Sequence, residues 1–347
     1  MTNKLTDGLI IDEPAEIEKI SERLREVLRT HLHRRGLVVA ISGGIDSAVC
    51  AALAVHAVGA QRVFGLLLPE RDSASESTIR GRMMVKQLGI AHEEFDIAPV
   101  LDDLGCYHWR DEAIRAVFPA YGPEWKSKII IAGGQAGGLN YFKLVVQSPD
   151  GKLFEERLDS KNYLQIVAAT NFKQRVRKTV EYFHADRLNY AVVGTPNRLE
   201  YDQGFFVKNG DGSADVKPIA HLYKTQVYAL ARHLKLPEEI CNAQPTTDTY
   251  SMAQGQDEFY YALPYDKMDV ALLAFNNGES STILAKELGI SFEQAEFIYR
   301  DIQAKRKTTG MLHWPGIPIE IVNGPNNKPP ILGEEKNYRV KISGGKL

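Results

Sequence analysis

This chain has few cysteines and no long apolar run. The first absence argues against a disulfide-stabilised or zinc-cluster protein, and the second argues against a membrane-spanning or secreted one. Cys50, Cys106 and Cys241 lie far apart in a sequence of 347 residues. Neither a disulfide framework nor a zinc cluster is indicated, so we expect buried thiols. No segment is apolar for long enough to cross a bilayer, and the first residues lack the apolar stretch of a signal peptide. We therefore expect a cytoplasmic protein.

An excess of charge is also missing. The formal net charge is −2 at pH 7, which gives no electrostatic reason to expect nucleic acid as a partner. With 44% hydrophobic and 25% charged residues, the chain can bury a substantial core. We see no internal repeat, so length and composition predict one large domain or two small ones.

Two common nucleotide-binding motifs are absent: the G-x-x-x-x-G-K-[ST] loop and the G-x-G-x-x-G turn. What is present is Ser-Gly-Gly-Ile-Asp-Ser at 42–47, between the apolar run 37–41 and the apolar segment 48–58. Glycines let the main chain approach a ligand closely, and the N-terminus of the following helix attracts anions. The motif predicts a pyrophosphate-binding loop; the alternative is an ordinary strand–turn–helix junction.

Asp46 within this loop indicates a metal ion. A carboxylate repels a bare phosphate unless a divalent cation lies between them, as Mg²⁺ does in nucleotide sites. Ser42 and Ser47 can donate hydroxyl hydrogen bonds to the same ligand. Glu200 follows the apolar strand predicted at 190–195 and is placed to share the cation with Asp46.

The apolar pattern predicts an α/β fold, a doubly wound parallel sheet flanked by helices. Strands are expected at 37–41, 63–68, 91–97 and 190–195, and helices at 15–33, 48–58, 76–88, 170–183, 224–234, 267–275, 282–288 and 292–305. Ligands of such sheets bind beyond the carboxyl ends of the strands. Residues 42–47, 69–72 and 194–195 all fall there.

Residues 106–165 interrupt the alternation and are expected to form an inserted β-hairpin region. Residues 141–147 and 152–158 flank an Asp-Gly turn, which predicts the hairpin. The glycine-rich stretch 133–138 is either a phosphate loop or a linker, and the missing GK[ST] favours a linker. We expect one domain over 1–325 and a tail over 326–347.

A second group of polar motifs lies downstream of the loop. Residues 204–212 combine an aromatic pair, a lysine and an aspartate in a turn-rich segment, which is typical of a mobile lid. Lys224 opens a helix and can neutralise triphosphate charge. Each of these features taken alone is more often structural than functional; their joint order along the chain is more specific.

That order resembles the ammonia-using NAD synthetases, which are ATP pyrophosphatases. The resemblance is carried by residues 42–47, Asn171 with Arg175, and residues 194–200, 204–215, 222–227, 245–248 and 257–258, within about 15–105 and 165–310. It implies a Rossmann-like sheet of the adenine nucleotide alpha hydrolase type. It also implies a homodimer that binds the dinucleotide across the subunit interface.

The resemblance implies a two-step amide ligase. The nicotinate carboxylate of deamido-NAD would attack the α-phosphorus of ATP, and ammonia would then displace AMP from the acyl-adenylate. Glutamine-using relatives carry an extra amidase domain for which this chain has no room. Ammonia is therefore the expected donor, and a separate glutaminase docking on the inserted region stays open.

Residue roles follow from the same resemblance. ATP would contact Ser42, Gly43, Gly44, Asp46, Ser47, Arg80, Thr195, Lys224 and Thr246. Deamido-NAD would contact Asn171, Arg175, Phe205, Lys208 and Asp215, with Phe205 stacking on a ring. Asp46, Lys208, Asp211 and Lys224 would be catalytic, and Asp46 and Glu200 would hold Mg²⁺.

The chain departs from the family pattern in the acceptor half more than in the ATP half. Ala304 stands where members often have a histidine that helps hold the dinucleotide, and Thr247 and Pro196 also differ from the usual motifs. Two alternatives stay open: an enzyme that amidates or thiolates another acceptor, and a nucleotide-binding regulatory protein without catalysis. The intact set of predicted catalytic and metal-binding residues argues against the second.

Overall fold

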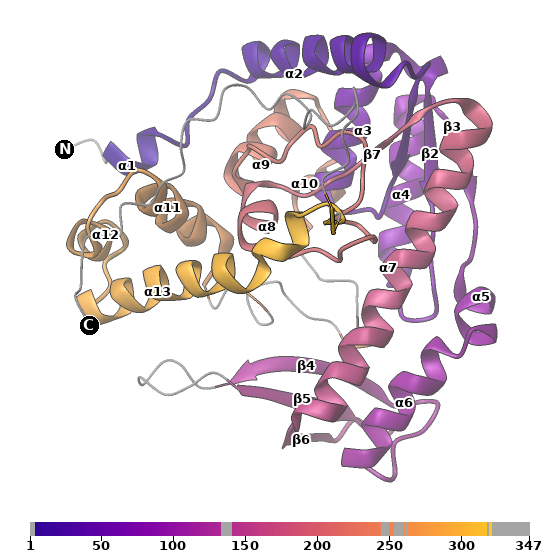
Figure 1. Cartoon of the computed structure of the whole chain (residues 1–347), viewed down its shortest axis with the longest axis vertical. Coiled ribbons are helices and arrows are strands. Elements are labelled where there is room, and N and C mark those ends of the chain that lie inside the picture. Colours follow the sequence, from indigo (N-terminus) through magenta and orange to yellow (C-terminus); the bar gives the residue numbers. More distant parts are fainter. Residues whose placement is uncertain are drawn as a thin grey trace. The chain divides into compact units, whose positions relative to one another are not determined.

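The computed structural model describes residues 4–132, 141–243, 250–252, 260, 263–317 and 319–320 (Figure 1). The chain divides into two units, Met1–Leu312 and His313–Leu347. The site described below belongs to the first unit. The expected boundary between a domain at 1–325 and a tail at 326–347 lies outside the described residues, so it stays a prediction.

The central sheet has four parallel strands in the order β3-β2-β1-β7. They are β1 (Leu37–Ala40), β2 (Val63–Leu67), β3 (Ala91–Glu94) and β7 (Ala191–Val193). All four predicted strands are present, although β3 and β7 are shorter than the predicted 91–97 and 190–195. Leu37, Val38 and Val39 are fully buried, as expected for a strand covered on both faces.

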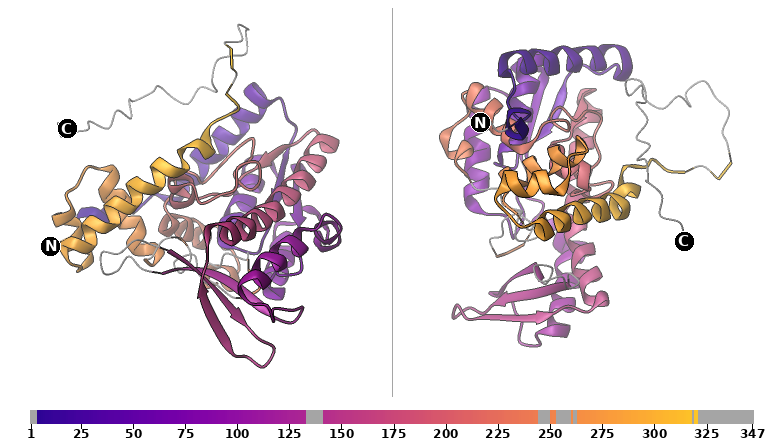
Figure 2. Two further views of the ribbon diagram at one scale, coloured as in Figure 1. Left: turned by 60° about the horizontal axis from the view of Figure 1, so that its bottom comes forward. Right: turned by 90° about the vertical axis from the view of Figure 1, so that its left-hand side faces the viewer.

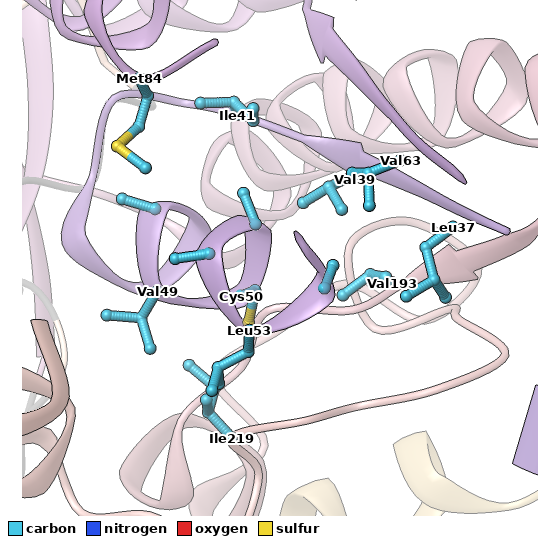
Figure 3. Packing of buried hydrophobic residues seen from close by; sticks show 14 of the residues in the cluster. Leu37, Val39, Ile41, Val49, Cys50, Leu53, Val63, Met84, Val193 and Ile219 are labelled. Atoms are coloured by element: carbon cyan, nitrogen blue, oxygen red, sulfur yellow. The ribbon is translucent and has the colours of Figure 1, made fainter. Parts of the chain in front are cut away.

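Helices cover both faces of this sheet, which confirms the doubly wound architecture. Leu37 and Val39 belong to one buried cluster, together with residues of α2, α3, α4 and α9, whereas Val38 and Val192 belong to another with residues of α5, α6 and α7. Figure 3 shows part of the first cluster, in which α3 lies between Val39 and Ile41 on one side and Ile219, next to Leu53, on the other.

The helices largely follow the predicted ranges. Their bounds are α1 (Lys4–Asp7), α2 (Glu13–Val27), η1 (Leu28–Leu32), α3 (Ile45–Val58), η2 (Ala60–Arg62), α4 (Ser75–Leu88), α5 (Ala98–Asp103), α6 (Cys106–Val117), α7 (Ser160–Leu188), α8 (Arg198–Gln203), α9 (Lys224–His233), α10 (Glu238–Cys241), α11 (Tyr265–Asn276), α12 (Ser281–Leu288), α13 (Phe292–Thr309) and η4 (Gly310–His313). The expected helix at 15–33 changes to a π-helical turn at Leu28 and ends at His33, which has a φ of 51°.

The α7 helix begins ten residues before its expected start at 170. The carboxylate of Asp159 accepts a hydrogen bond of 2.9 Å from the backbone N–H of Asn162 and so caps the helix. Lys173, Lys178, Glu181 and His184 are buried along α7. Because polar residues occupy much of its buried face, the apolar pattern does not reveal the full helix.

The inserted region is more regular than expected. β5 (Tyr141–Gln147) and β6 (Leu153–Arg157) form the predicted hairpin, and β4 (Lys126–Ala132) pairs with β5 to complete an antiparallel sheet. The region predicted as a β-hairpin insertion at 106–165 also contains α6, which packs along α7 through buried residues such as Tyr107. The glycine-rich stretch 133–138 lies outside the described residues.

The remaining helices form a separate packed group. α11, α12 and α13 share a buried cluster that includes Met268, Leu284 and Ile302. Figure 1 shows α11, α12 and α13 close together on the left, and both views of Figure 2 show the three-stranded sheet at the bottom. Within the described ranges, no helix is both long and apolar enough to cross a membrane.

Candidate active site

A cavity of about 590 Å³ lies beyond the carboxyl ends of β1, β2 and β7. Residues 40–47 line one side of it, and α7 and the segment from Gly194 to Asp211 line others. This volume is within the usual range of ~300–1,000 Å³ for small-molecule sites. The structure thus places the predicted loop where ligands of parallel sheets bind.

The 42–47 loop has the backbone geometry predicted from its glycines. Gly43 has a φ of 81°, and a Cβ atom built on it would lie 2.1 Å from the carbonyl oxygen of Ser77. No other residue fits there without displacing the start of α4. Gly44 is the N-cap of α3 and has no side chain that would compete for the N–H groups of the first turn.

The two serines of the loop are already oriented by hydrogen bonds. The Ser47 hydroxyl donates to the Gly44 carbonyl at 2.9 Å, and its oxygen accepts from the backbone N–H of Ser42 at 3.2 Å. The Ser42 and Ser47 hydroxyl oxygens lie 3.1 Å apart. The loop is therefore shaped before a ligand arrives.

Asp46 and Glu200 both line the cavity, and Asn197 holds them. The Asn197 Nδ2 donates to Asp46 Oδ1 at 3.2 Å, while its backbone N–H donates to Glu200 Oε2 at 3.1 Å. Asn197 and Glu200 form the capping box of α8, which fixes the glutamate in the first turn of that helix. Sequence reasoning included Asn197 in a motif but gave it no role.

Lys224 completes this group. Its Nζ pairs with Asp46 Oδ2, and its side chain is 2% exposed. Burial alone would lower the pKa of Lys224, but the carboxylates of Asp46 and Glu200 outweigh burial and raise the pKa above its ordinary value. The lysine therefore stays protonated inside the cavity.

The two carboxylates fit a magnesium ion that is also held by phosphate. Mg²⁺ in nucleotide sites is usually bound through one or two carboxylates plus phosphate oxygens and water. Among the residues that the structure describes, no cluster of three or more His, Cys, Asp or Glu side chains is placed to hold a metal ion.

The other predicted ATP residues fall on the same side of the cavity. Arg80 lines it, and the Arg80 Nε donates to the carbonyl of Gly43 at 3.0 Å. Thr195 lines the cavity at the end of β7. Thr246 lies outside the described residues.

The predicted dinucleotide residues are only partly brought together. Asn171 and Phe205 line the cavity, whereas Arg175, Lys208 and Asp215 are absent from its wall. Arg175 Nε donates to the Lys208 carbonyl at 3.3 Å, and Lys208 Nζ donates to a backbone carbonyl of residue 311 at 3.1 Å. Asp215 Oδ2 accepts from a backbone N–H of β7 at 2.7 Å.

Asp211 lies in the predicted lid segment and faces the cavity. Its Oδ1 accepts from the backbone N–H of Val207 at 2.7 Å, so the carboxylate also closes its own turn. Burial raises the pKa of Asp211 above its usual range.

A buried ion pair on α7 was missed by sequence reasoning. Lys178 Nζ and Glu181 Oε2 lie 2.7 Å apart, and both residues line the cavity. Burial raises the pKa of Glu181, with the Lys178 charge opposing it. Charged residues three positions apart on a helix usually lie in solvent, so only the tertiary structure reveals this pair.

Phe205 is stacked on Tyr260, with ring centroids 4.5 Å apart and an interplanar angle of 28°. Both residues line the cavity, together with Tyr163 and Tyr250. The predicted stacking residue therefore belongs to an aromatic wall. Tyr260 had no role in the sequence analysis because no local motif marks it.

Comparisons with known proteins give the family. A family profile described as NAD synthase matches residues 16–114 and 138–309, and it omits the part of the insertion that holds β4. A relative from Rhizobium meliloti (strain 1021), named NH(3)-dependent NAD(+) synthetase, is 57% identical over 308 residues, which are 88% of this chain and 92% of the relative.

Solved structures agree with this result. NAD+ synthetase from Burkholderia Pseudomallei is 25% identical with a TM-score of 0.54, covering 88% of this chain and 95% of that one. NMN synthetase from Francisella tularensis is 21% identical with a TM-score of 0.62, covering 90% and 100%, and shares the fold. The sheet is of the adenine nucleotide alpha hydrolase type, as predicted. The chain belongs to the NAD synthase family.

Proposed function

We propose that this chain is an ammonia-dependent ligase that converts deamido-NAD to NAD, with ATP as co-substrate. The observation that carries the proposal is the convergence of the 42–47 loop, Asp46, Glu200 and Lys224 on one cavity. The 57% identical relative has this activity in its name. No observation favours a different acceptor.

ATP would bind with its phosphates at the start of α3. The α3 N-terminus and the serine hydroxyls would donate to phosphate oxygens, and Lys224 would add a positive charge. Asp46 and Glu200 would hold a magnesium ion between themselves and the phosphates, where the ion supplies positive charge to the leaving pyrophosphate. The 42–47 loop, with Asp46, Glu200 and Lys224, would therefore bind the nucleotide.

Deamido-NAD would occupy the side of the cavity formed by Asn171 and Phe205. Its carboxylate must reach the α-phosphorus, so it must lie next to the loop. Arg175 would contact the dinucleotide from α7, and Lys208 and Asp215 would contact it from the segment after α8. Lys208 and Asp211 would act at the reacting atoms. Because Lys208 lies outside the cavity wall, it would reach the reacting atoms only through a movement of the 204–212 segment.

The proposal also includes the oligomeric state and the cellular location of the enzyme. The active form would be a homodimer in the cytoplasm, where buried free thiols such as Cys50 and Cys106 persist in reduced form. Ammonia would enter as the free molecule. A separate glutaminase that supplies it would dock on the inserted region.

The test is pyrophosphate release from Mg²⁺-ATP with deamido-NAD, with and without ammonium, while NAD is followed by mass spectrometry. We expect NAD, AMP and pyrophosphate in equal amounts only when ammonium is present. Pyrophosphate release with another carboxylate, and none with deamido-NAD, would keep the ATP half of the proposal and overturn the acceptor. No pyrophosphate with any acceptor would overturn both.

A further inference from the structure

Asp269 is a fully buried carboxylate on α11 for which the proposed chemistry has no use. It lies against the N-terminus of α9. Its Oδ1 accepts from the backbone N–H of Lys224 at 3.2 Å, and its Oδ2 accepts from the backbone N–H of Thr225 at 2.7 Å. Both carboxylate oxygens are therefore used on the first two residues of one helix.

This arrangement is costly and so calls for a physical explanation. A carboxylate buried without hydrogen bonds loses several kcal/mol of hydration, and here the N-terminus of α9 and the charge of Lys224 restore part of it. An apolar residue on α11 would fill the same space without that cost. The N-cap residue of α9, Tyr223, donates its own N–H to Gln226 Oε1 within the same helix at 2.9 Å. The N–H groups of the next two residues find their acceptor on another helix, at Asp269.

The first residue of α9 is the lysine of the site. The Asp269 contact fixes the backbone of Lys224 at the point from which its side chain extends to Asp46. A lysine side chain has four flexible bonds and about 2 kcal/mol of rotamer freedom, so the position of its ammonium depends on a fixed Cα.

Lys224 must also change partner during the proposed reaction. In the structure it pairs with Asp46, which is the proposed metal ligand. When the nucleotide enters, that carboxylate turns to the cation and the lysine turns to phosphate. The Lys224 ammonium can reach the phosphates at the right position only if the N-terminus of α9 stays in place while the side chain changes partner.

We propose that Asp269 is a positioning residue, which holds the start of α9 so that Lys224 meets the ATP phosphates. The inference rests on the proposed function. It adds a residue from the separately packed helices α11, α12 and α13 to the machinery of the nucleotide site. Asp269 does not touch the reacting atoms; it acts through Lys224.

The test compares Asp269→Asn with wild type. An amide keeps the shape but offers one acceptor oxygen for two N–H donors, so the start of α9 loses one anchor. Because a displacement of about 1 Å near the reacting atoms can cost about 100-fold in rate, we expect kcat/KM for ATP to fall at least about tenfold. We expect KM for deamido-NAD to change less than about twofold. Asp266→Asn on the exposed side of the same helix is the matched control and is expected to equal wild type.

A rise in KM for deamido-NAD as large as the fall in kcat/KM for ATP, or unchanged kinetics in a folded Asp269→Asn variant, would overturn the proposal. Hydrogen exchange of a peptide covering 222–228 gives a measurement that needs no turnover. We expect faster exchange there in Asp269→Asn, and unchanged exchange would contradict the inference even if wild type forms no NAD. Should the asparagine variant not fold, Asp269→Ser is measured in the same way.

Discussion

At the scale of single residues, the site depends on a small set of charges that balance one another. Asp46 and Glu200 supply two negative charges and Lys224 one positive charge, all facing one cavity. The excess negative charge favours a cation, and the protonated lysine favours phosphate. The same three side chains therefore suit a complex of a divalent ion with a polyphosphate better than either component alone.

Replacing Asp46 by asparagine is expected to abolish pyrophosphate release. The change removes the proposed metal ligand and leaves the buried ammonium of Lys224 without its partner, which costs about 3–5 kcal/mol of folding stability. The measurement is pyrophosphate formation at saturating Mg²⁺-ATP, with the folded fraction followed by circular dichroism. Near-normal turnover in a folded variant would remove the metal role from Asp46.

Replacing Lys208 by alanine is expected to slow the chemical step more than it weakens ATP binding. Lys208 lies on the 204–212 segment and its ammonium is held by the carbonyl of Met311, outside the cavity wall. Its proposed role requires it to come to the reacting atoms after ATP has bound. The check is a single-turnover rate beside a direct ATP affinity, with the exposed Lys307→Ala as control. A rise in KM for ATP alone would contradict the placement.

At the scale of elements, α6 and α7 hold the segment that follows β2. Lys173 Nζ lies 3.0 Å from Glu70 and 2.6 Å from Asp72, and Arg110 pairs with Asp72 as well. The Tyr107 hydroxyl donates to Glu70 at 2.8 Å. These side chains are almost fully buried, so the wall of the cavity beyond β2 is fixed by charge pairs from two helices.

Arg110→Leu is expected to destabilise the fold strongly, by about 3–5 kcal/mol, because Asp72 then keeps a buried charge with one partner fewer. Lys143→Ala breaks an ion pair with Glu155 on the exposed face of the insertion, where the carboxylate side chain is 55% exposed. That loss is expected to be less than about 1 kcal/mol. Urea unfolding of both variants checks the contrast, and similar losses would show that the buried cluster adds no special stability.

The same elements show how far the sequence can lead. β1 and β2 were predictable because their apolar runs are short, continuous and followed by turns, and the 42–47 loop because its glycines and serines act locally. The start of α7 and the whole of α6 were not, because their buried faces carry Lys173, Arg110 and other charges. Asn197 and Asp269 were not recognised because their roles depend on partners about 45 residues away or more.

At the scale of the whole molecule, the site is assembled from segments that are distant in the sequence. The doubly wound order places β7 beside β1, which brings Glu200 next to Asp46 across more than 150 residues. α11 then supports α9 from outside the sheet. Stability of the fold and geometry of the site therefore share the same buried carboxylates, and the pH dependence of unfolding can report on them.

Asp269 gives the clearest case for such a measurement. Burial raises its pKa to about 6, against 3.8 in a model compound, although the N–H groups of α9 oppose this effect. Since the folded pKa exceeds the unfolded one, the stabilising contribution of this group is complete below pH 4 and is lost as pH rises through 6. One pKa unit corresponds to about 1.4 kcal/mol, so the loss amounts to about 3 kcal/mol. Asparagine does not titrate. The free energy of unfolding of wild type minus that of Asp269→Asn should therefore fall by this amount between pH 4 and pH 7, whatever the other carboxylates contribute to both proteins. A difference that stays constant over this range would mean that the carboxylate is as well solvated in the fold as in the unfolded chain.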